Sequence, residues 1–131
     1  MAEPTQKKIL CLDFDGVLHS YTSGWQGAAV IPDPPVPGAI AFLREAVKHF
    51  QVAILSSRSH QPGGKQAMRE WLGYWMAAER LDDNEDLSWA GLIDWPDEKP
   101  PAWLTIDDRA VQFTGSWPSM EWIATFKPWN K

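Results

Sequence analysis

The sequence has little cysteine, no excess of basic residues and no long apolar run. Its one cysteine, Cys11, excludes a disulfide framework within the chain, so we expect a reducing, cytoplasmic compartment. No run approaches the roughly 18 apolar residues of a membrane-spanning helix. No signal-peptide core follows the polar N-terminal stretch MAEPTQKK. We therefore expect a cytoplasmic protein with no membrane partner, and the oligomeric state stays open.

The charge balance limits the classes of partner. The chain has 12 Lys and Arg against 17 Asp and Glu, a formal net charge of −5 at pH 7. A chain of this sign repels polyanions as a whole, which excludes a non-specific nucleic-acid binder but permits a local anion site. With 131 residues, 44% of them hydrophobic, we expect one domain spanning residues 1–131. Nine tryptophans should serve mainly as core and rim packing, with a few against a ligand.

Apolar runs and helical patterns alternate along the chain. Residues 9–12, 51–55 and 102–106 are mostly apolar runs, typical of strands buried on both faces. Between and after them, apolar residues recur at helical spacing over about 38–50 and 65–80. This order predicts an α/β fold, a Rossmann-like three-layer sandwich around a central parallel sheet with right-handed crossovers.

The remaining segments carry weaker patterns. Glycines and prolines in residues 19–37 predict a hairpin-like flap or ordered loop at about 19–36. Short strands are expected near 91–95 and 111–114, and a closing amphipathic segment around 120–126. The acidic segment 81–91 is interpreted as a solvated connection, because its spacing does not fit a metal-binding loop.

Polar residues follow each of the three predicted buried strands. They are Asp13 and Asp15 after the first strand, Ser56, Ser57 and Arg58 after the second, and Asp107 and Asp108 after the third. In parallel sheets ligands bind at the carboxyl ends of the strands, so these residues should meet in one site.

The first of these clusters contains two carboxylates one residue apart. Side chains at i and i+2 point the same way, so Asp13 and Asp15 share a site while Phe14 turns into the core, and Gly16 permits a tight exit. Carboxylates this close repel each other unless a cation lies between them. Taken alone, the pair also fits a turn or a helix cap. Together with the aspartates at 107 and 108, it predicts a site for Mg²⁺ that keeps some of its waters.

A bound cation would attract phosphate, and several residues could donate to it. Ser56 and Ser57 offer hydroxyl and backbone N–H groups, Arg58 a guanidinium fork and Lys99 a point charge. We count Ser57, Arg58 and Gly16 as substrate contacts. A structural salt bridge is an equal alternative for Arg58.

The ordered set of motifs resembles the haloacid dehalogenase superfamily. DFDGV at 13–17 resembles its first motif, DxDx[TV], and the other three follow in order as Ser56, Lys99 and the pair Asp107 and Asp108. The four motifs span residues 9 to 110. A DxD pair alone is a weak pattern, whereas the ordered set is specific.

The resemblance implies roles for the acidic residues. Asp13 would attack phosphorus to form an aspartyl-phosphate, and Asp15 would act as general acid and then base. Mg²⁺ would be held by Asp13, the backbone carbonyl of Asp15 and a motif-four aspartate, with Asp108 favoured over Asp107.

Further roles follow from the same resemblance. Ser56 and Lys99 would bind the phosphoryl oxygens, with Asp107 orienting Lys99. Because Lys99 lies in a proline-rich connection, Lys65 is the alternative lysine. Two histidines, His19 and His60, lie on loops near the site, and substrate contact is the less favoured interpretation of both.

The segment between Asp15 and the second strand is too short for a cap domain, so the chain resembles the capless members. Arg58 and the loop SHQPGGK also resemble the phosphatase domains of bacteriophage polynucleotide kinase-phosphatases. The implied function is a Mg²⁺-dependent phosphomonoester hydrolase acting on a phosphorylated small molecule, a nucleotide or a nucleic-acid terminal phosphate. The alternatives are a non-catalytic module that binds metal or phosphate, and a phosphotransferase.

Overall fold

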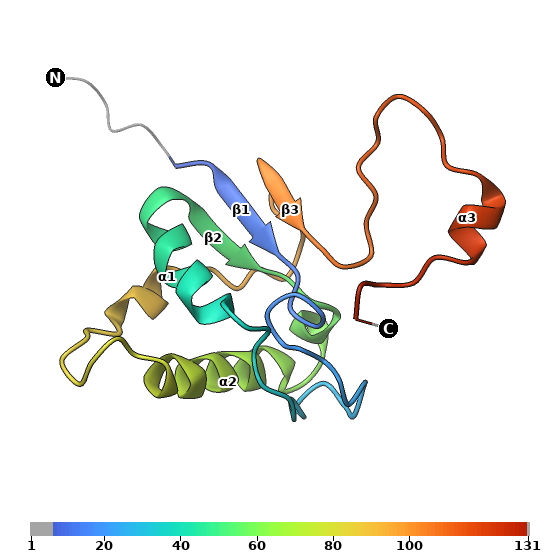
Figure 1. Ribbon diagram of the computed structural model, residues 1–131. Coiled ribbons are helices and arrows are strands. Elements are labelled where there is room, and N and C mark those ends of the chain that lie inside the picture. Colours follow the sequence, from blue (N-terminus) through green and yellow to red (C-terminus); the bar gives the residue numbers. More distant parts are fainter. Residues whose placement is uncertain (1–6, 131) are drawn as a thin grey trace, which may run out of the picture.

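Three short parallel strands form the centre of the fold (Figure 1). The computed structural model describes residues 7–130. The strands are β1 (Ile9–Leu12), β2 (Gln51–Ile54) and β3 (Leu104–Ile106), in the order β2-β1-β3. In this register Leu12 lies beside Ile54 and Ile106, so the three strands end at the same edge. The small open parallel sheet with its helices confirms an α/β architecture.

The two main helices follow the predicted patterns. Helix α1 (Ala39–His49) buries Ile40, Leu43 and Val47. Helix α2 (Gly64–Ala78) buries a stripe of larger side chains centred on Trp71. Both stripes have the spacing that places apolar side chains on one face of a helix. The 3₁₀ helices η1 and η2 and the short helix α3 complete the fold; they span Ser57–His60, Ser88–Leu92 and Met120–Ala124.

The core lies between β1, β2 and the two long helices. Leu12 and Phe14 from the β1 side meet Ile54, and the buried stripes of α1 and α2 close over them. Phe14 is fully buried although it lies between two aspartates. The packing of Phe14 in the core therefore fixes the backbone that carries both carboxylates.

The flap leaves the end of β1 and returns before α1. Its base is hairpin-like, because Ser20 N–H donates to the carbonyl of Pro34 (2.9 Å) and Val36 N–H donates to that of Leu18 (2.8 Å). An ordered loop at about 19–36 was predicted, and the structure agrees.

Three expectations about the strands are wrong. The third strand is exposed rather than buried, because β3 is the edge strand and no further described element covers its outer side. The strand expected at 91–95 is reduced to a single bridge at Asp94 beside β2. The strand cannot begin earlier because Gly91 and Leu92 belong to η2. It cannot continue further because Pro96 has no N–H to donate to a neighbouring strand. Residues 111–114 form no strand, since the chain leaves the sheet there (Figure 1).

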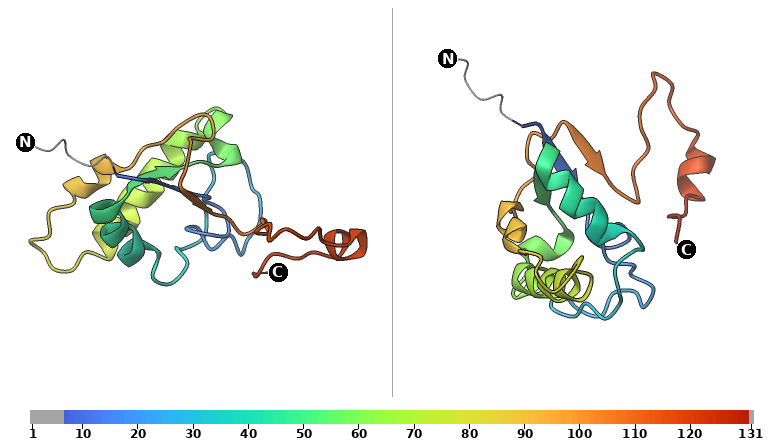
Figure 2. Two further views of the ribbon diagram at one scale, coloured as in Figure 1. Left: turned by 90° about the horizontal axis from the view of Figure 1, so that it is seen from above. Right: turned by 60° about the vertical axis from the view of Figure 1, so that its left-hand side comes forward.

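The chain after β3 runs away from the sheet, forms α3 and returns to the end of β1 (Figures 1 and 2). There the Trp129 Nε1 donates to the carbonyl of Gly16 (2.8 Å), and the Asn130 amide donates to that of Ser20 (3.1 Å). Five of the nine tryptophans are exposed, four of them after residue 100. The expectation of core and rim packing therefore holds for the other four tryptophans, which lie in or against the core, but not for the four after residue 100.

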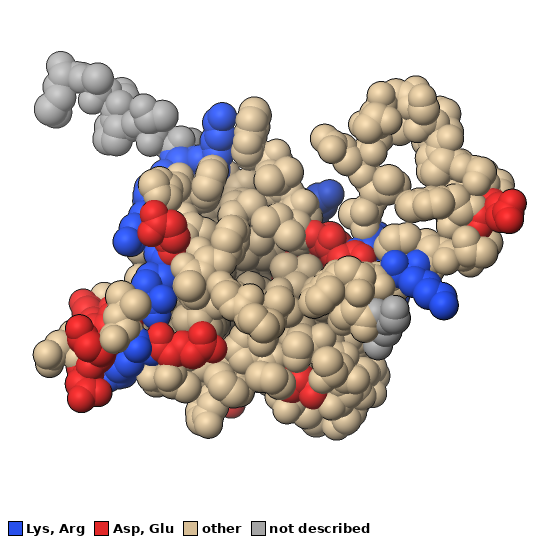
Figure 3. All heavy atoms as spheres, in the orientation of Figure 1, with Lys and Arg blue, Asp and Glu red and all other residues tan. Residues whose placement is uncertain are grey.

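Two surface features bear on partners. Among the helices of residues 7–130, none is both long and apolar enough to cross a membrane. On the face in Figure 3, acidic and basic side chains are interspersed rather than gathered into a basic patch.

Candidate active site

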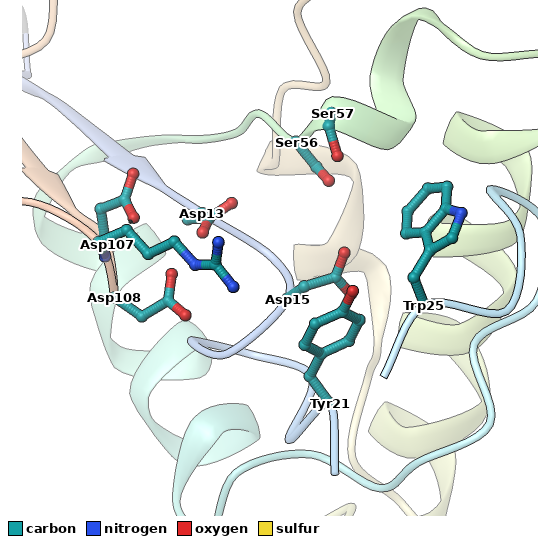
Figure 4. Close-up of a pocket in the computed structure, with 9 residues that line it drawn as sticks. Asp13, Asp15, Tyr21, Trp25, Ser56, Ser57, Asp107 and Asp108 are labelled. Carbon is teal, nitrogen blue, oxygen red and sulfur yellow. Dashed lines mark hydrogen bonds between the residues drawn. The ribbon is translucent and has the colours of Figure 1, made fainter. Parts of the chain in front are cut away.

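A pocket of about 320 Å³ opens at the carboxyl edge of the sheet. It is lined by Asp13, Asp15, Tyr21, Trp25, Ser56, Ser57, Asp107, Asp108 and Arg109. Figure 4 shows Asp13, Asp107 and Asp108 on one side of it, with Tyr21 and Trp25 from the flap on the other. Six of the predicted site residues thus come together from the ends of all three strands.

The backbone after β1 aims both carboxylates at this pocket. Asp13 N–H still donates to the carbonyl of Ile106 (3.0 Å), so the strand geometry continues beyond Leu12. Phe14 then points into the core, and Asp13 and Asp15 project to the opposite side. The carbonyl of Phe14 next accepts the N–H groups of Leu18 (2.9 Å) and His19 (3.0 Å), which closes a tight turn.

Gly16 is needed in that turn for two reasons. Its φ of 83° lies in the left-handed region that favours glycine. A β-carbon there would also collide with the Asp108 carboxylate. Gly16 was predicted as a substrate contact, but the described residues that line the pocket do not include it. Its role in the structure is to form the turn after β1 and to leave room beside it for the Asp108 carboxylate.

Asp13, Asp107 and Asp108 form an acidic cluster. Each offers a carboxylate oxygen, and these oxygens lie within 4.8 Å of one another. Burial raises the pKa of Asp13 to about 7, and the neighbouring charges of Asp107 and Asp108 act in the same direction against a backbone hydrogen bond at Phe14. A donor set made only of oxygen suits a hard divalent cation. The Asp15 carboxylate lies outside this cluster.

Asp15 has a different environment. Its carboxylate accepts hydrogen bonds from Arg58 Nε (2.9 and 3.2 Å) and from His19 Nδ1 (2.8 Å). Burial alone would raise the pKa of Asp15, but these hydrogen bonds and the Arg58 charge outweigh it and hold that pKa below its usual value. The two aspartates of the DxD pair are therefore driven in opposite directions, Asp13 toward the acid and Asp15 toward the carboxylate.

Arg58 lies beneath the pocket. The side chain is fully buried, and Nη1 donates to the carbonyls of Gly27, Ala28 and Val30 in the flap (2.8 to 3.1 Å). Its guanidinium carbon lies 4.7 Å from the centre of the Trp25 ring. Arg58 therefore ties the flap to Asp15, which corresponds to the salt-bridge alternative rather than to a substrate contact.

The two serines after β2 are placed as predicted. Ser56 caps η1, where its Oγ accepts the N–H of Arg58 (3.1 Å) and its own N–H donates to the Oγ of Ser59 (3.1 Å). These contacts fix Ser56 at the wall of the pocket. Ser57 also lines the pocket and is exposed, so it is free to meet a ligand.

The predicted lysine does not reach the pocket. Lys99 is exposed in the connection between η2 and β3, and it is absent from the described residues that line the cavity. The alternative, Lys65, pairs with Asp97 (2.6 Å) and does not line the cavity either. Among the described residues of the wall, Arg109 is the basic one, and its backbone N–H donates to the Asp107 carboxylate (2.9 Å).

Sequence reasoning did not single out Tyr21 and did not predict the burial of His19. Tyr21 lines the pocket with a φ of 62°, which is rare for a residue other than glycine, and Figure 4 shows its hydroxyl pointing toward Asp15. His19, which the sequence placed on a loop near the site, is fully buried beneath it. The nearby glycines and prolines predict a loop but do not show which of its side chains turn inward.

Comparison of the chain with protein-family models, with curated proteins and with solved structures found no match. The resemblance to the haloacid dehalogenase superfamily therefore stays a prediction from the four motifs.

Proposed function

We propose that this chain is a Mg²⁺-dependent phosphomonoester hydrolase with a capless haloacid-dehalogenase-like fold, and that Asp13 is its nucleophile. The observation that carries the proposal is the acidic cluster of Asp13, Asp107 and Asp108 facing Ser56 and Ser57 across one pocket. Phosphoryl transfer through an acyl phosphate needs a carboxylate nucleophile, hydroxyl donors beside it and oxygen ligands for a metal.

The metal site would consist of oxygen ligands only. Asp13 and Asp108, with Asp107 and the backbone carbonyl of Asp15, would hold Mg²⁺. When bound, Mg²⁺ supplies positive charge that offsets the repulsion between Asp13 and the phosphoryl oxygens. A pKa of about 7 for Asp13 means that cation and proton compete for this carboxylate near neutral pH.

The reaction proceeds in two displacements. In the first, an oxygen of Asp13 bonds to phosphorus as the bond to the leaving oxygen breaks, and Asp15 in its acid form gives that oxygen a proton. In the second, water attacks phosphorus, the bond to Asp13 breaks, and the Asp15 carboxylate takes the water proton. Ser56, Ser57 and Arg109 would bind the phosphoryl oxygens, with Arg109 supplying the charge expected from Lys99.

The ionisation of Asp15 affects the two displacements differently. Its lowered pKa suits the base role in the second displacement but leaves little of the acid form for the first. Esters whose leaving group departs readily as an anion should therefore react fastest.

The substrate class follows from the flap. Trp25 lines the pocket, is 46% exposed and packs against the buried Arg58 guanidinium. An aromatic ring fixed in this way can stack on a nucleobase. We therefore propose a nucleotide or a nucleic-acid terminal phosphate as substrate, bound through its end rather than along its backbone because the net charge is −5.

One observation favours a second function. Lys99 and Lys65 lie outside the pocket wall, and none of the described residues that line the pocket is a lysine, although the motif resemblance implies one. A non-catalytic module that binds metal or phosphate needs no such lysine. A phosphotransferase would differ from a hydrolase only in passing the phosphoryl group to an acceptor alcohol instead of water.

The deciding experiment measures release of inorganic phosphate. The substrates are p-nitrophenyl phosphate, nucleotides, and 3′- and 5′-phosphorylated oligonucleotides, each with Mg²⁺ or EDTA. The variants are Asp13→Asn and, as a matched control, Asp83→Asn, which removes an exposed carboxylate outside the pocket.

We expect release that needs Mg²⁺, survives in Asp83→Asn and is lost in Asp13→Asn. Equal release by the wild type and Asp13→Asn would rule out the nucleophile. Mg²⁺ binding without release from any ester would favour the binding module. Release of inorganic phosphate that falls with added alcohol while a phosphorylated alcohol forms would favour the transferase.

A further inference from the structure

His19 is a buried polar side chain next to the proposed site. Its ring is fully buried and packs among Phe14, Tyr21 and Trp71, with ring centroids 5.7 to 5.8 Å away. It is not among the described residues that line the pocket, so it does not touch a bound substrate. A buried imidazole must have its nitrogens hydrogen-bonded, and both of them are.

The hydrogen bonds fix which ring nitrogen carries the proton. The backbone N–H of Asp33 donates to Nε2 (3.1 Å), so Nε2 is an unprotonated acceptor. Nδ1 then carries the proton and donates it to Oδ1 of Asp15 (2.8 Å). His19 is thus a neutral imidazole that joins the flap backbone to the proposed acid–base residue.

Asp33, at the end of this bridge that lies in the flap, is itself held by hydrogen bonds. The Asp33 carboxylate accepts hydrogen bonds from the backbone N–H (2.8 Å) and the hydroxyl (2.6 Å) of Ser23. The carbonyl of Asp33 accepts a hydrogen bond from Trp71 Nε1 (2.9 Å), which anchors it to α2. A continuous line of contacts therefore runs from α2 through Asp33 and His19 to Asp15.

Arg58 alone does not fix the orientation of the Asp15 carboxylate. Its Nε–H is shared between the two carboxylate oxygens, so the carboxylate can still turn about that single donor. A second donor on Oδ1, arriving from a different element, removes this freedom. His19 supplies that donor.

We propose that His19 is a positioning residue, which fixes the orientation of the Asp15 carboxylate and couples it to the position of the flap. The catalytic part of this proposal rests on the proposed hydrolase function, whereas the structural link does not. Because the flap also carries Trp25, the same bridge acts with Arg58 to hold the stacking surface beside the acid–base residue.

Two substitutions at His19 separate the two ends of the bridge. In His19→Asn the side-chain amide lies near the position of Nδ1 and can still donate to Asp15. In His19→Gln the amide reaches the position of Nε2 instead, so the contact with Asp33 can persist while the donor to Asp15 is lost. The pair thus distinguishes loss of positioning from a general loosening of the flap.

Steady-state kinetics with p-nitrophenyl phosphate give the first readout. We expect kcat to fall by on the order of 10²-fold in His19→Gln and to be mostly restored in His19→Asn, because small misplacement of a catalytic group has effects of that size. KM should fall together with kcat, since Asp15 then acts mainly as the base of the second displacement and the aspartyl-phosphate accumulates. Equal kcat for the wild type and His19→Gln, or equal losses in both variants, would overturn the proposal.

The second readout needs no activity and no variant at His19. In the ¹⁵N NMR spectrum of the wild-type protein, we expect the His19 ring to be the neutral form protonated at Nδ1, with an Nδ1 resonance that shifts in Asp15→Asn. A ring protonated at Nε2, or one unaffected by Asp15→Asn, would overturn the structural link. If the wild type releases no phosphate while the NMR result holds, the hydrolase function and the catalytic role fail and the link between flap and Asp15 stands.

Discussion

Replacing Asp13 with asparagine should stabilise the metal-free protein at neutral pH. The folded protein holds Asp13 with a pKa of about 7, against an ordinary value of 3.8. The acid form is therefore favoured by folding, and this group is most stabilising below about pH 4. As the pH rises from about 4 to about 7, the unfolding free energy falls. Above about pH 7 Asp13 is ionised in both states, and its contribution to the unfolding free energy no longer changes. Asparagine does not ionise, so the unfolding free energy of Asp13→Asn does not fall in this way.

The size of the change in unfolding free energy follows from the pH range between the two pKa values. Each pH unit between the unfolded and folded pKa values corresponds to about 1.4 kcal/mol. Between about pH 5 and pH 7 the ceiling is therefore about 2.7 kcal/mol. Because Asp13 is partly exposed, solvent screening should reduce the observed change to on the order of 1 kcal/mol. Asp15 and Asp33, whose pKa values are lowered, stay ionised throughout this interval and do not contribute.

Urea denaturation in EDTA, followed by tryptophan fluorescence from about pH 5 to pH 8, measures this difference. The wild type should lose stability relative to Asp13→Asn as the pH rises, and Mg²⁺ should restore the wild type alone. Parallel pH profiles for the two proteins would refute the reasoning, because they would show that Asp13 has no raised pKa in the acidic cluster.

Two further substitutions test how the site is held together. Gly16→Ala should lower the unfolding free energy by about 1–3 kcal/mol, because it adds a clash with Asp108 to an unfavourable φ, whereas Gly24→Ala has a similar φ, no close neighbour and an expected loss of about 1 kcal/mol. Equal losses in chemical denaturation would show that the Asp108 carboxylate turns aside without cost. Arg58→Met leaves the Asp15 carboxylate buried without its cation and should destabilise by about 3–5 kcal/mol, against less than about 1 kcal/mol for Lys65→Met at an exposed pair. A small loss in Arg58→Met would indicate that solvent reaches the Asp15 carboxylate.

Local patterns predicted the parts of the fold that depend on a single element. The apolar run before Asp13 and the alternation through Asp15 predicted both β1 and the direction of its carboxylates. Helical spacing likewise predicted α1 and α2, because one buried stripe is enough to define such a helix. The meeting of Asp13 with Asp107 and Asp108 followed from the parallel order of the strands, which the structure also shows.

Features that depend on neighbours could not be predicted in this way. Whether β3 is central or at the edge depends on which elements pack beside it, and its sequence is equally apolar in both cases. The path of the connection before β3 decides whether Lys99 reaches the pocket, and motif order says nothing about that path. His19 is buried by contacts with Asp33, 14 residues away, and with Trp71 on α2, neither of which has a local pattern.

The central claim is that Asp13 takes up the phosphoryl group, and its most direct test is to trap that intermediate. Mg²⁺-loaded protein is mixed with the best phosphate ester, quenched in acid within one turnover, digested and analysed by mass spectrometry. We predict that the peptide containing Asp13 gains the mass of one phosphoryl group, and that Asp15→Asn, which lacks the base for the second displacement, accumulates more of it. Phosphate release with no labelled peptide in either protein, or a label on another residue, would contradict the claim.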